Sequence, residues 1–163
     1  MAEAEETVTV TLDVNGESRE VEIVADETLV ETLRRRFGLR SVRATCGIGI
    51  CGTCTVQLDG LAVSSCSLLT QQVTDAEITT SEGLADGDDL AAVQEAFLEH
   101  RAYQCSYCIP GMVVAVDACM KNRPDVTFEE LREELAGNLC RCGTYPQILE
   151  AARDLISARN QAG

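Results

Sequence analysis

The sequence predicts an α+β fold in which a small sheet domain is followed by a helical domain. Over the first part of the chain, apolar and polar residues alternate as they do in strands. After Asp89 the apolar residues recur instead at the spacing of helices. Between the two patterns, residues 83–89 are polar, acidic and glycine-containing, which is typical of a linker. We therefore expect one domain over residues 1–83 and another over residues 84–163.

Composition and charge narrow the class of protein. The formal net charge of −14 comes without a basic stripe, so we expect no binding to nucleic acid. No run of about 18 apolar residues is present, which argues against a membrane span. The chain begins Met-Ala-Glu-Ala-Glu-Glu, unlike a signal peptide, so we expect a cytoplasmic protein. Nine cysteines in that reducing compartment indicate metal binding rather than disulfides.

The first element is a predicted β-hairpin. Apolar residues alternate over residues 8–14, and an Asn-Gly pair then predicts a type I′ turn. With a two-residue turn, Val10 faces Val21 and Val8 faces Ile23 across the strands. Both strands therefore bury the same face.

A helix and three short strands should complete this domain. Asp26 or Thr28 caps the helix, and Gly38 ends it. Residues 54–66 predict two strands joined by an Asp-Gly turn, and residues 78–80 predict a last strand. The result is a small sheet that carries a long loop.

Four helices are expected in the second domain. The first follows Asp88 or Asp89 as its cap, and its inward stripe is Leu90, Val93, Phe97 and Leu98. The second has a proline in its first turn, and the third opens with a Thr-Phe-Glu-Glu capping box. The fourth begins at Pro146. Apolar stripes on four short helices suggest a small bundle.

The loop in the first domain reads Cys-Gly-Ile-Gly-Ile-Cys-Gly-Thr-Cys over residues 46–54. This C-x4-C-x2-C spacing, followed by a distant fourth cysteine, is the plant-type arrangement for a [2Fe–2S] cluster. The glycines allow left-handed backbone and let main-chain N–H groups point at sulfur. A zinc site or a disulfide knot is the alternative, but neither requires such a loop. The expected ligands are Cys46, Cys51, Cys54 and Cys66.

Two cysteine pairs lie in the helical half, Cys105 with Cys108 and Cys140 with Cys142. Each pair falls just before or at a predicted helix start, where free N–H groups favour thiolates. Four ligands in two short pairs fit zinc as well as an iron–sulfur cluster. We favour a second [2Fe–2S] cluster, because two centres make an electron path whereas zinc would add only stability.

The remaining candidate residues indicate no catalysis by this chain. Cys119 lies on the apolar stripe of a predicted helix and should be buried rather than a ligand. His100, the sole histidine, is expected at the surface or at a helix end. No nucleophile–base pair, paired-carboxylate site or phosphate loop is recognisable. The chain should carry electrons without transforming a substrate itself.

The motifs together make the sequence similar to a known family. It resembles the small iron–sulfur subunit of the molybdenum hydroxylases, a family that includes xanthine dehydrogenase, aldehyde oxidoreductase, carbon monoxide dehydrogenase and isoquinoline oxidoreductase. The resemblance spans residues 8–158 and includes both cysteine sets, Glu-Gly-Leu at 82–84, Gln-Cys-Ser-Tyr-Cys-Ile-Pro-Gly-Met at 104–112 and Gly-Asn-Leu-Cys-Arg-Cys at 137–142. It implies a plant-type β-grasp ferredoxin domain followed by a four-helix bundle domain.

The resemblance also implies a function. The cluster on Cys46, Cys51, Cys54 and Cys66 would be distal to the active site, and the cluster on Cys105, Cys108, Cys140 and Cys142 proximal. Gln104 and Cys142 would face a molybdopterin cofactor on a large partner subunit, which hydroxylates an N-heterocycle, an aldehyde or a similar substrate. Electrons would then pass to a flavin (FAD) subunit or a cytochrome.

Some positions depart from the commonest family pattern, but none removes a ligand. Ser106 replaces a usual glycine, Ile109 a usual threonine, and Gly143-Thr144 stands where Thr-Gly is more common. The last feature resembles the isoquinoline oxidoreductase branch, some of whose members lack a flavin subunit. The alternative function is a free-standing two-cluster ferredoxin. That alternative predicts a closed polar surface, whereas a partner subunit predicts that some apolar side chains are exposed among Tyr103, Tyr107, Ile109 and Met112.

Overall fold

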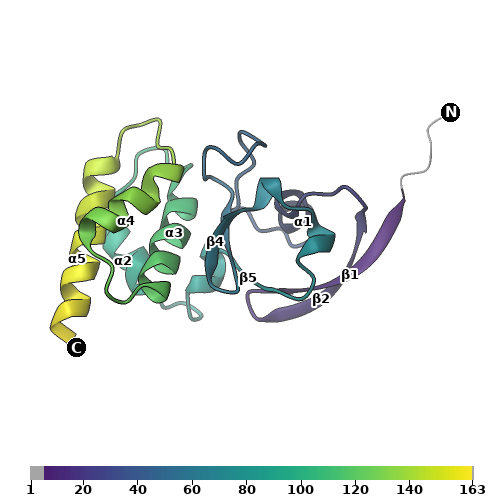
Figure 1. The fold of residues 1–163 in the computed structure, drawn as a ribbon, viewed down its shortest axis with the longest axis horizontal. Helices are drawn as coiled ribbons and strands as arrows, with labels where there is room; N and C mark the ends of the chain where they lie inside the picture. The colour runs from purple at the N-terminus through teal and green to yellow at the C-terminus, as the bar shows by residue number, and fades with distance from the viewer. Residues whose placement is uncertain (1–5, 163) are drawn as a thin grey trace.

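The first half of the chain forms a five-stranded sheet in the order β2-β1-β5-β3-β4 (Figure 1). This computed structural model describes residues 6–162, so residues 1–5, which begin the acidic N-terminus discussed above, lie outside the described part. β1 and β5 run parallel, and the other neighbours are antiparallel. The strands are β1 (Thr7–Val14), β2 (Glu17–Val24), β3 (Thr55–Leu58), β4 (Leu61–Ser64) and β5 (Glu77–Thr79).

The predicted hairpin is confirmed. Val8 pairs with Ile23 and Val10 with Val21. Asn15 and its following glycine both have positive φ, as a type I′ turn requires. The apolar residues of both strands accordingly face one core.

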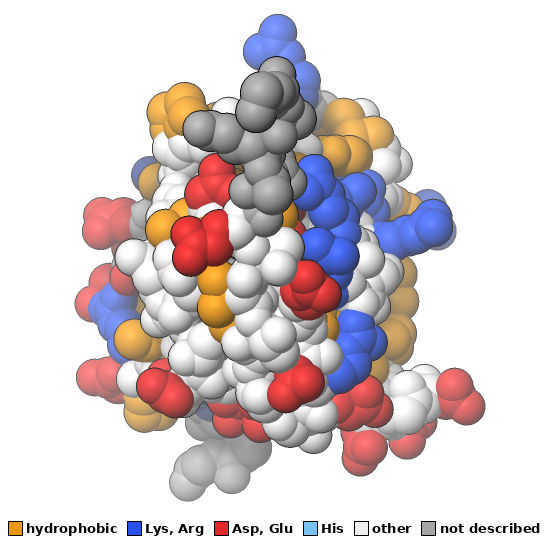
Figure 2. Space-filling view, turned by 90° about the vertical axis from the view of Figure 1, so that its right-hand side faces the viewer, with side chains coloured by type: hydrophobic (Ala, Val, Ile, Leu, Met, Phe, Trp, Pro, Cys, Tyr) orange, Lys and Arg blue, Asp and Glu red, His pale blue; other side chains and the backbone are white. Residues whose placement is uncertain are grey.

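Helix α1 (Leu29–Arg35) contributes to the same core as the sheet. Its cap is Thr28, one of the two predicted candidates, and Glu31 accepts a hydrogen bond from the Thr28 main-chain N–H at 3.1 Å. The helix ends at Arg35, so Gly38, which has φ +71°, lies past its last turn. Figure 2 shows Lys and Arg side chains gathered along one side of the face that this end of the molecule presents.

The second half forms four helices around a separate core. They are α2 (Ala92–Glu99), α3 (Ile109–Asn122), α4 (Phe128–Glu134) and α5 (Tyr145–Ala162). The capping box that opens α4 is confirmed, since Thr127 and Glu130 exchange hydrogen bonds. In the described residues no helix is both long enough and apolar enough to cross a membrane.

The prediction for α2 was wrong at its start. The cap is Ala91, whose N–H is bonded by the Gln94 side chain at 2.9 Å, rather than Asp88 or Asp89. Main-chain hydrogen bonds between Asp86 and Asp89 hold residues 86–89 in a turn instead. Leu90 lies before the helix and is 42% exposed, and Leu98, although inside the helix, is 51% exposed. Neither leucine therefore belongs to the inward stripe.

Helix α3 connects the two halves by packing against β3 and β4. Gln57 of β3 is buried and donates to the Asp117 carboxylate at 2.8 Å and to the main-chain oxygen of Val114 at 3.3 Å. The ribbon view places α3 between the sheet and the other helices (Figure 1). This contact brings the cysteine loop of the sheet half beside the helical half.

Candidate metal centres

The first cysteine set lies on two loops at one end of β3 and β4. Cys46 and Cys51 are in the loop between α1 and β3, Cys54 directly precedes β3, and Cys66 follows β4 in a 3-10 turn. Cys54 and Cys66 are buried, whereas Cys46 and Cys51 are half-buried. The antiparallel pairing of β3 with β4 brings the distant fourth cysteine back to the loop.

Main-chain N–H groups of this loop point at sulfur, as its glycines predicted. The N–H of Gly49 lies 3.3 Å from Cys66 Sγ, and that of Ile50 lies 3.4 Å from Cys46 Sγ. Gly47, Gly49 and Gly52 all have φ between +66° and +73°. Side chains with a Cβ rarely adopt this conformation, so the glycines make the donor arrangement possible.

The thiols of the first set differ in acidity. Main-chain N–H groups of Ile48, Cys51 and Ile50 lower the pKa of Cys46 to about 6. Burial raises the pKa of Cys54 to about 11. The loop therefore stabilises thiolate charge on Cys46 at its exposed side. On the buried side, ionisation of Cys54 requires a cation beside it.

The second cysteine set lies at two helix starts. Cys108 is the N-cap residue of α3, and Cys105 is exposed three residues earlier. Cys140 and Cys142 are in the turn before α5. Ser106, between the first two cysteines, has φ +63°, a left-handed conformation that favours glycine.

Hydroxyl groups support this second set. The Thr144 hydroxyl lies 2.9 Å from Cys140 Sγ, and the Tyr145 hydroxyl accepts from the Cys140 N–H at 2.8 Å. Burial opposes ionisation of Cys140, but bonds from Thr144 lower its pKa to about 7. Burial, together with the Cys140 thiol beside it, raises the pKa of Cys108 to about 12. Thr144 and Tyr145 were not predicted as site residues, because their proximity depends on how α5 packs.

The sulfurs of each set come together two by two, and none of the nine cysteines forms a disulfide. The pairs are Cys46 with Cys51, Cys54 with Cys66, Cys105 with Cys142 and Cys108 with Cys140. Over residues 6–162, no three Cys, His, Asp or Glu side chains are arranged to hold a single ion. Zinc needs four ligands on one centre, whereas a [2Fe–2S] cluster has two irons that share four thiolates. The donor set fits the two-iron group better.

Comparison with known proteins agrees with this donor set. A family model described as "2Fe-2S iron-sulfur cluster binding domain" matches residues 12–91, and one described as "[2Fe-2S] binding domain" matches residues 80–153. The nicotinate dehydrogenase small FeS subunit of Eubacterium barkeri is 40% identical, over 90% of this chain and 93% of the relative. The xanthine dehydrogenase iron-sulfur-binding subunit of Escherichia coli O157:H7 is also 40% identical, over 91% and 94%. The chain belongs to the small iron–sulfur subunits of the molybdenum hydroxylases.

Solved structures agree with the whole fold of this iron–sulfur subunit. Quinoline 2-oxidoreductase from Pseudomonas putida 86 matches with a TM-score of 0.88 and 33% identity, over 95% of this chain and 97% of that one. Aldehyde oxidoreductase from Desulfovibrio gigas matches with a TM-score of 0.88 and 31% identity. The match covers 96% of this subunit but 18% of the Desulfovibrio chain. As a family member, the chain is the iron–sulfur subunit of an oxidoreductase and has two [2Fe–2S] domains.

The surface of the iron–sulfur subunit beside the second set is partly apolar. Gln104 is exposed, and its side-chain amide donates to the main-chain oxygen of Cys142 at 3.2 Å. Tyr103 and Tyr107 are each 41% exposed and Leu139 is 49% exposed. The exposure expected of some side chains around this set is confirmed for the two tyrosines. Met112, which was named with them, is instead fully buried in the helical core.

A cavity of about 370 Å³ is lined by cysteines of both sets of the subunit. Cys51 lines it from the first set, and Cys105, Cys108 and Cys140 line it from the second. Tyr107, at its wall, also stacks beneath the Arg43 guanidinium, which is 4.8 Å from the ring centroid. Residues far apart in the sequence thus bring cysteines of both sets to the wall of one cavity.

Two further residues of the subunit have no place in either set. His100 is at the end of α2, as predicted, and its Nε2 lies 2.8 Å from an Asp154 carboxylate oxygen. Cys119 is half-buried rather than fully buried, because it lies in the wall of a groove between α3 and β4. Burial raises the pKa of its thiol, so it remains protonated at neutral pH.

Proposed function

We propose that this chain is an electron-transfer subunit that holds two [2Fe–2S] clusters. Cys46, Cys51, Cys54 and Cys66 bind the distal cluster, and Cys105, Cys108, Cys140 and Cys142 bind the proximal one. The observation that carries the proposal is the pairing of all eight thiols in two sets, with Cys51 of the first set and three cysteines of the second lining one cavity. Each cluster supplies a site that takes up and releases one electron at a time.

The protein's own part is to stabilise charge on the sulfurs. N–H groups of Gly49 and Ile50 point at two thiols of the first set. At the second set the Thr144 hydroxyl points at Cys140 Sγ. Hydrogen bonds to cluster sulfurs favour the more negative state and are one of the ways a protein tunes a reduction potential. The two sets differ in these donors, so we expect two clusters of different potential.

We further propose that Gln104 and Cys142 face the molybdopterin cofactor of a large partner subunit. Supporting this, Gln104 is exposed and bonded to Cys142, and Tyr103, Tyr107 and Leu139 expose apolar surface around them. Exposed aromatic side chains that surround a polar centre are typical of an interface core. Relatives named as subunits of nicotinate and xanthine dehydrogenases support a partner that oxidises small substrates, N-heterocycles or aldehydes among them.

The distal end should pass electrons to a flavin subunit or to a cytochrome. Ile48 and Ile50 of the first loop are 68% and 60% exposed, which leaves apolar surface beside that set. In the same proposal, residues 1–83 are a β-grasp ferredoxin domain, residues 84–163 are a four-helix bundle, and the protein works in the cytoplasm. Nine cysteines with no disulfide among them favour such a reducing compartment.

Metal analysis and co-purification test this proposal together. The purified protein should contain about four irons and no zinc per chain. Two irons and one zinc would assign the second set to zinc. Expression with its genomic neighbours should yield a complex with a large molybdopterin subunit. A stable, fully loaded monomer that never co-purifies with such a subunit would make the chain a free-standing ferredoxin.

A further inference from the structure

The segments that carry the two cysteine sets contact each other at two successive main-chain carbonyl groups, those of Cys51 and Gly52. We call this contact the seam and define it by Gly52, Gly111, Asn138 and Leu139. The Leu139 N–H donates to the main-chain oxygen of Cys51 at 2.9 Å. The next carbonyl group along the first loop is that of Gly52, and its oxygen accepts from Nδ2 of the buried Asn138 at 3.0 Å.

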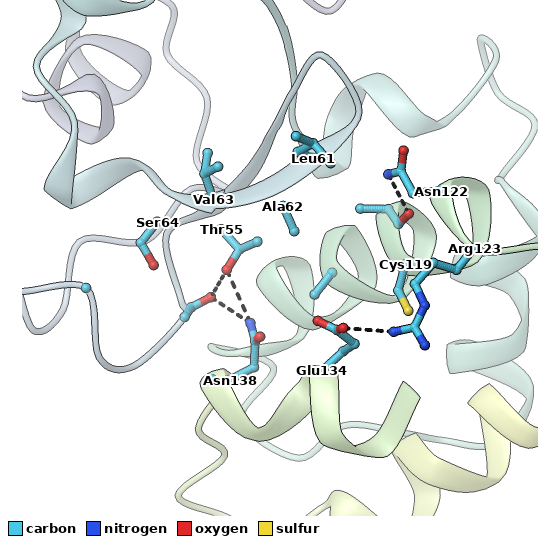
Figure 3. Close-up of a pocket in the computed structure, with 15 residues that line it drawn as sticks. Thr55, Leu61, Ala62, Val63, Ser64, Cys119, Asn122, Arg123, Glu134 and Asn138 are labelled. Carbon is cyan, nitrogen blue, oxygen red and sulfur yellow. Dashed lines mark hydrogen bonds and ion pairs between the residues drawn. The ribbon is translucent and has the colours of Figure 1, made fainter. Parts of the chain in front are cut away.

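Figure 3 shows Asn138 pointing from the helical half toward Thr55 of β3. Asn138 Nδ2 lies 3.3 Å from Thr55 Oγ1, and that hydroxyl donates in turn to the Gly52 oxygen at 2.8 Å. The Gly52 oxygen therefore accepts from two side chains, one from each half of the chain. Groups bonded this way in a buried site have little freedom to shift.

Helix α3 contacts the Gly52 carbonyl group from a third direction. A Cβ on Gly111 would lie 2.3 Å from the Gly52 oxygen, which is main-chain and cannot rotate away. Gly111 is in the first turn of α3, three residues after Cys108. A Cβ on Gly52 itself would lie 2.5 Å from Asn138 Nδ2 and 2.6 Å from the Gly137 oxygen. Both glycines are thus required for the close approach.

Three cysteine-bearing segments therefore meet at Gly52. They are the first loop, with Cys51 and Cys54 on either side of the glycine, the start of α3 after Cys108, and the segment that leads into Cys140. We propose that the seam sets the separation of the two cysteine sets and makes Gly111 and Asn138 positioning residues for electron exchange. This inference rests on the proposed function, since it assumes that both sets hold clusters. Electron exchange weakens steeply with distance, and the magnetic coupling of two reduced clusters falls with its cube.

The substitution Gly111→Ala tests the seam, and Gly137→Ala is its matched control. Neither glycine has a positive φ, and a Cβ on Gly137 would meet nothing within 4 Å. Alanine is a better helix former than glycine, so a defect in Gly111→Ala cannot come from helix propensity. Both variants are purified as the loaded protein, their iron is counted, and the spin–spin splitting of the fully reduced clusters is recorded by electron paramagnetic resonance.

We expect both variants to keep about four irons per chain. Relative to the wild type, the spin–spin splitting should change more in Gly111→Ala than in Gly137→Ala. An unchanged splitting in Gly111→Ala, with all iron retained, would overturn the inference.

If Gly111→Ala loses iron, a second variant is used to test the inference. Asn138→Asp keeps the side-chain shape but replaces the donor with an oxygen that repels the Gly52 oxygen. Its splitting should also shift, and a wild-type splitting in Asn138→Asp would overturn the inference. Wild-type protein with fewer than about four irons would instead count against the proposed function itself.

Discussion

The main-chain oxygen of Cys51 accepts a 2.9 Å hydrogen bond from the N–H of Leu139, the residue directly before Cys140. This bond joins the backbone of one cysteine set to that of the other. Because it involves main-chain atoms alone, a substitution of a cysteine side chain leaves it in place. Cluster binding by either set can therefore be abolished by mutation while the two halves of the chain stay together.

Cys51→Ser should remove the distal cluster and leave the proximal one. Serine is a poor ligand for iron in place of a thiolate, so the iron content should fall from about four to about two per chain. One of the two paramagnetic signals of the reduced protein should disappear, and turnover with an external acceptor should stop. Cys119→Ser is the control, because Cys119 pairs with none of the eight thiols and should keep about four irons. A Cys51→Ser protein with all its iron would contradict the ligand assignment.

Gln57→Leu should destabilise the junction between sheet and helix α3. The substitution removes a buried donor and leaves the Asp117 carboxylate with Lys121 alone, at 2.9 Å. An unsatisfied buried acceptor costs about 1–3 kcal/mol, which is the upper limit here because Lys121 still pairs with Asp117. Calorimetry should show a melting temperature about 2–4 °C lower for each kcal/mol lost. Replacing Asp117 as well, by leucine, should recover part of the loss. The exposed Gln71→Leu should have little effect, and an equal loss there would rule out this explanation.

Ser106→Gly should stabilise the protein. Ser106 is held at φ +63°, where a residue with a Cβ is strained by about 1–2 kcal/mol and glycine is not. Part of that gain is lost to the greater freedom of glycine in the unfolded chain, so we expect about 1 kcal/mol. Thermal unfolding of the loaded protein measures it. Ser106→Ala keeps the strain, and if it stabilises equally the backbone explanation fails.

Glu82→Gln should weaken the dependence of stability on acid. Burial opposes ionisation of Glu82, but hydrogen bonds from Ser41 and Thr80 outweigh it and lower the pKa of its carboxyl below 4.5. A carboxyl with a lowered folded-state pKa stabilises the fold above its unfolded pKa, and this stability is lost as the pH falls through the folded value. The wild type should therefore lose more stability below about pH 4.5 than Glu82→Gln does. Melting curves between pH 7 and 3 test this, with the exposed Glu133→Gln as control.

Local patterns predicted much of this fold because they depend on neighbouring residues. The hairpin register followed from alternation and an Asn-Gly turn, and the helix at Phe128 followed from the capping box before it. Both cysteine sets were also recognisable, since ligand spacing within a loop is a property of the chain alone. By contrast, the start of α2 was misjudged, because Asp89, one of the two predicted caps, bonds to Asp86 in a turn.

The sequence by itself determined the two-part organisation, the eight candidate ligands and the family. The tertiary structure alone decided which sulfur lies beside which, as in the 3.5 Å approach of Cys105 and Cys142. It also decided that Gly52 and Gly111 meet and that Asn138 bonds across the junction. These relationships depend on how β3, α3 and the turn before α5 pack together. No periodicity or motif in the sequence predicts contacts between residues so far apart in the chain.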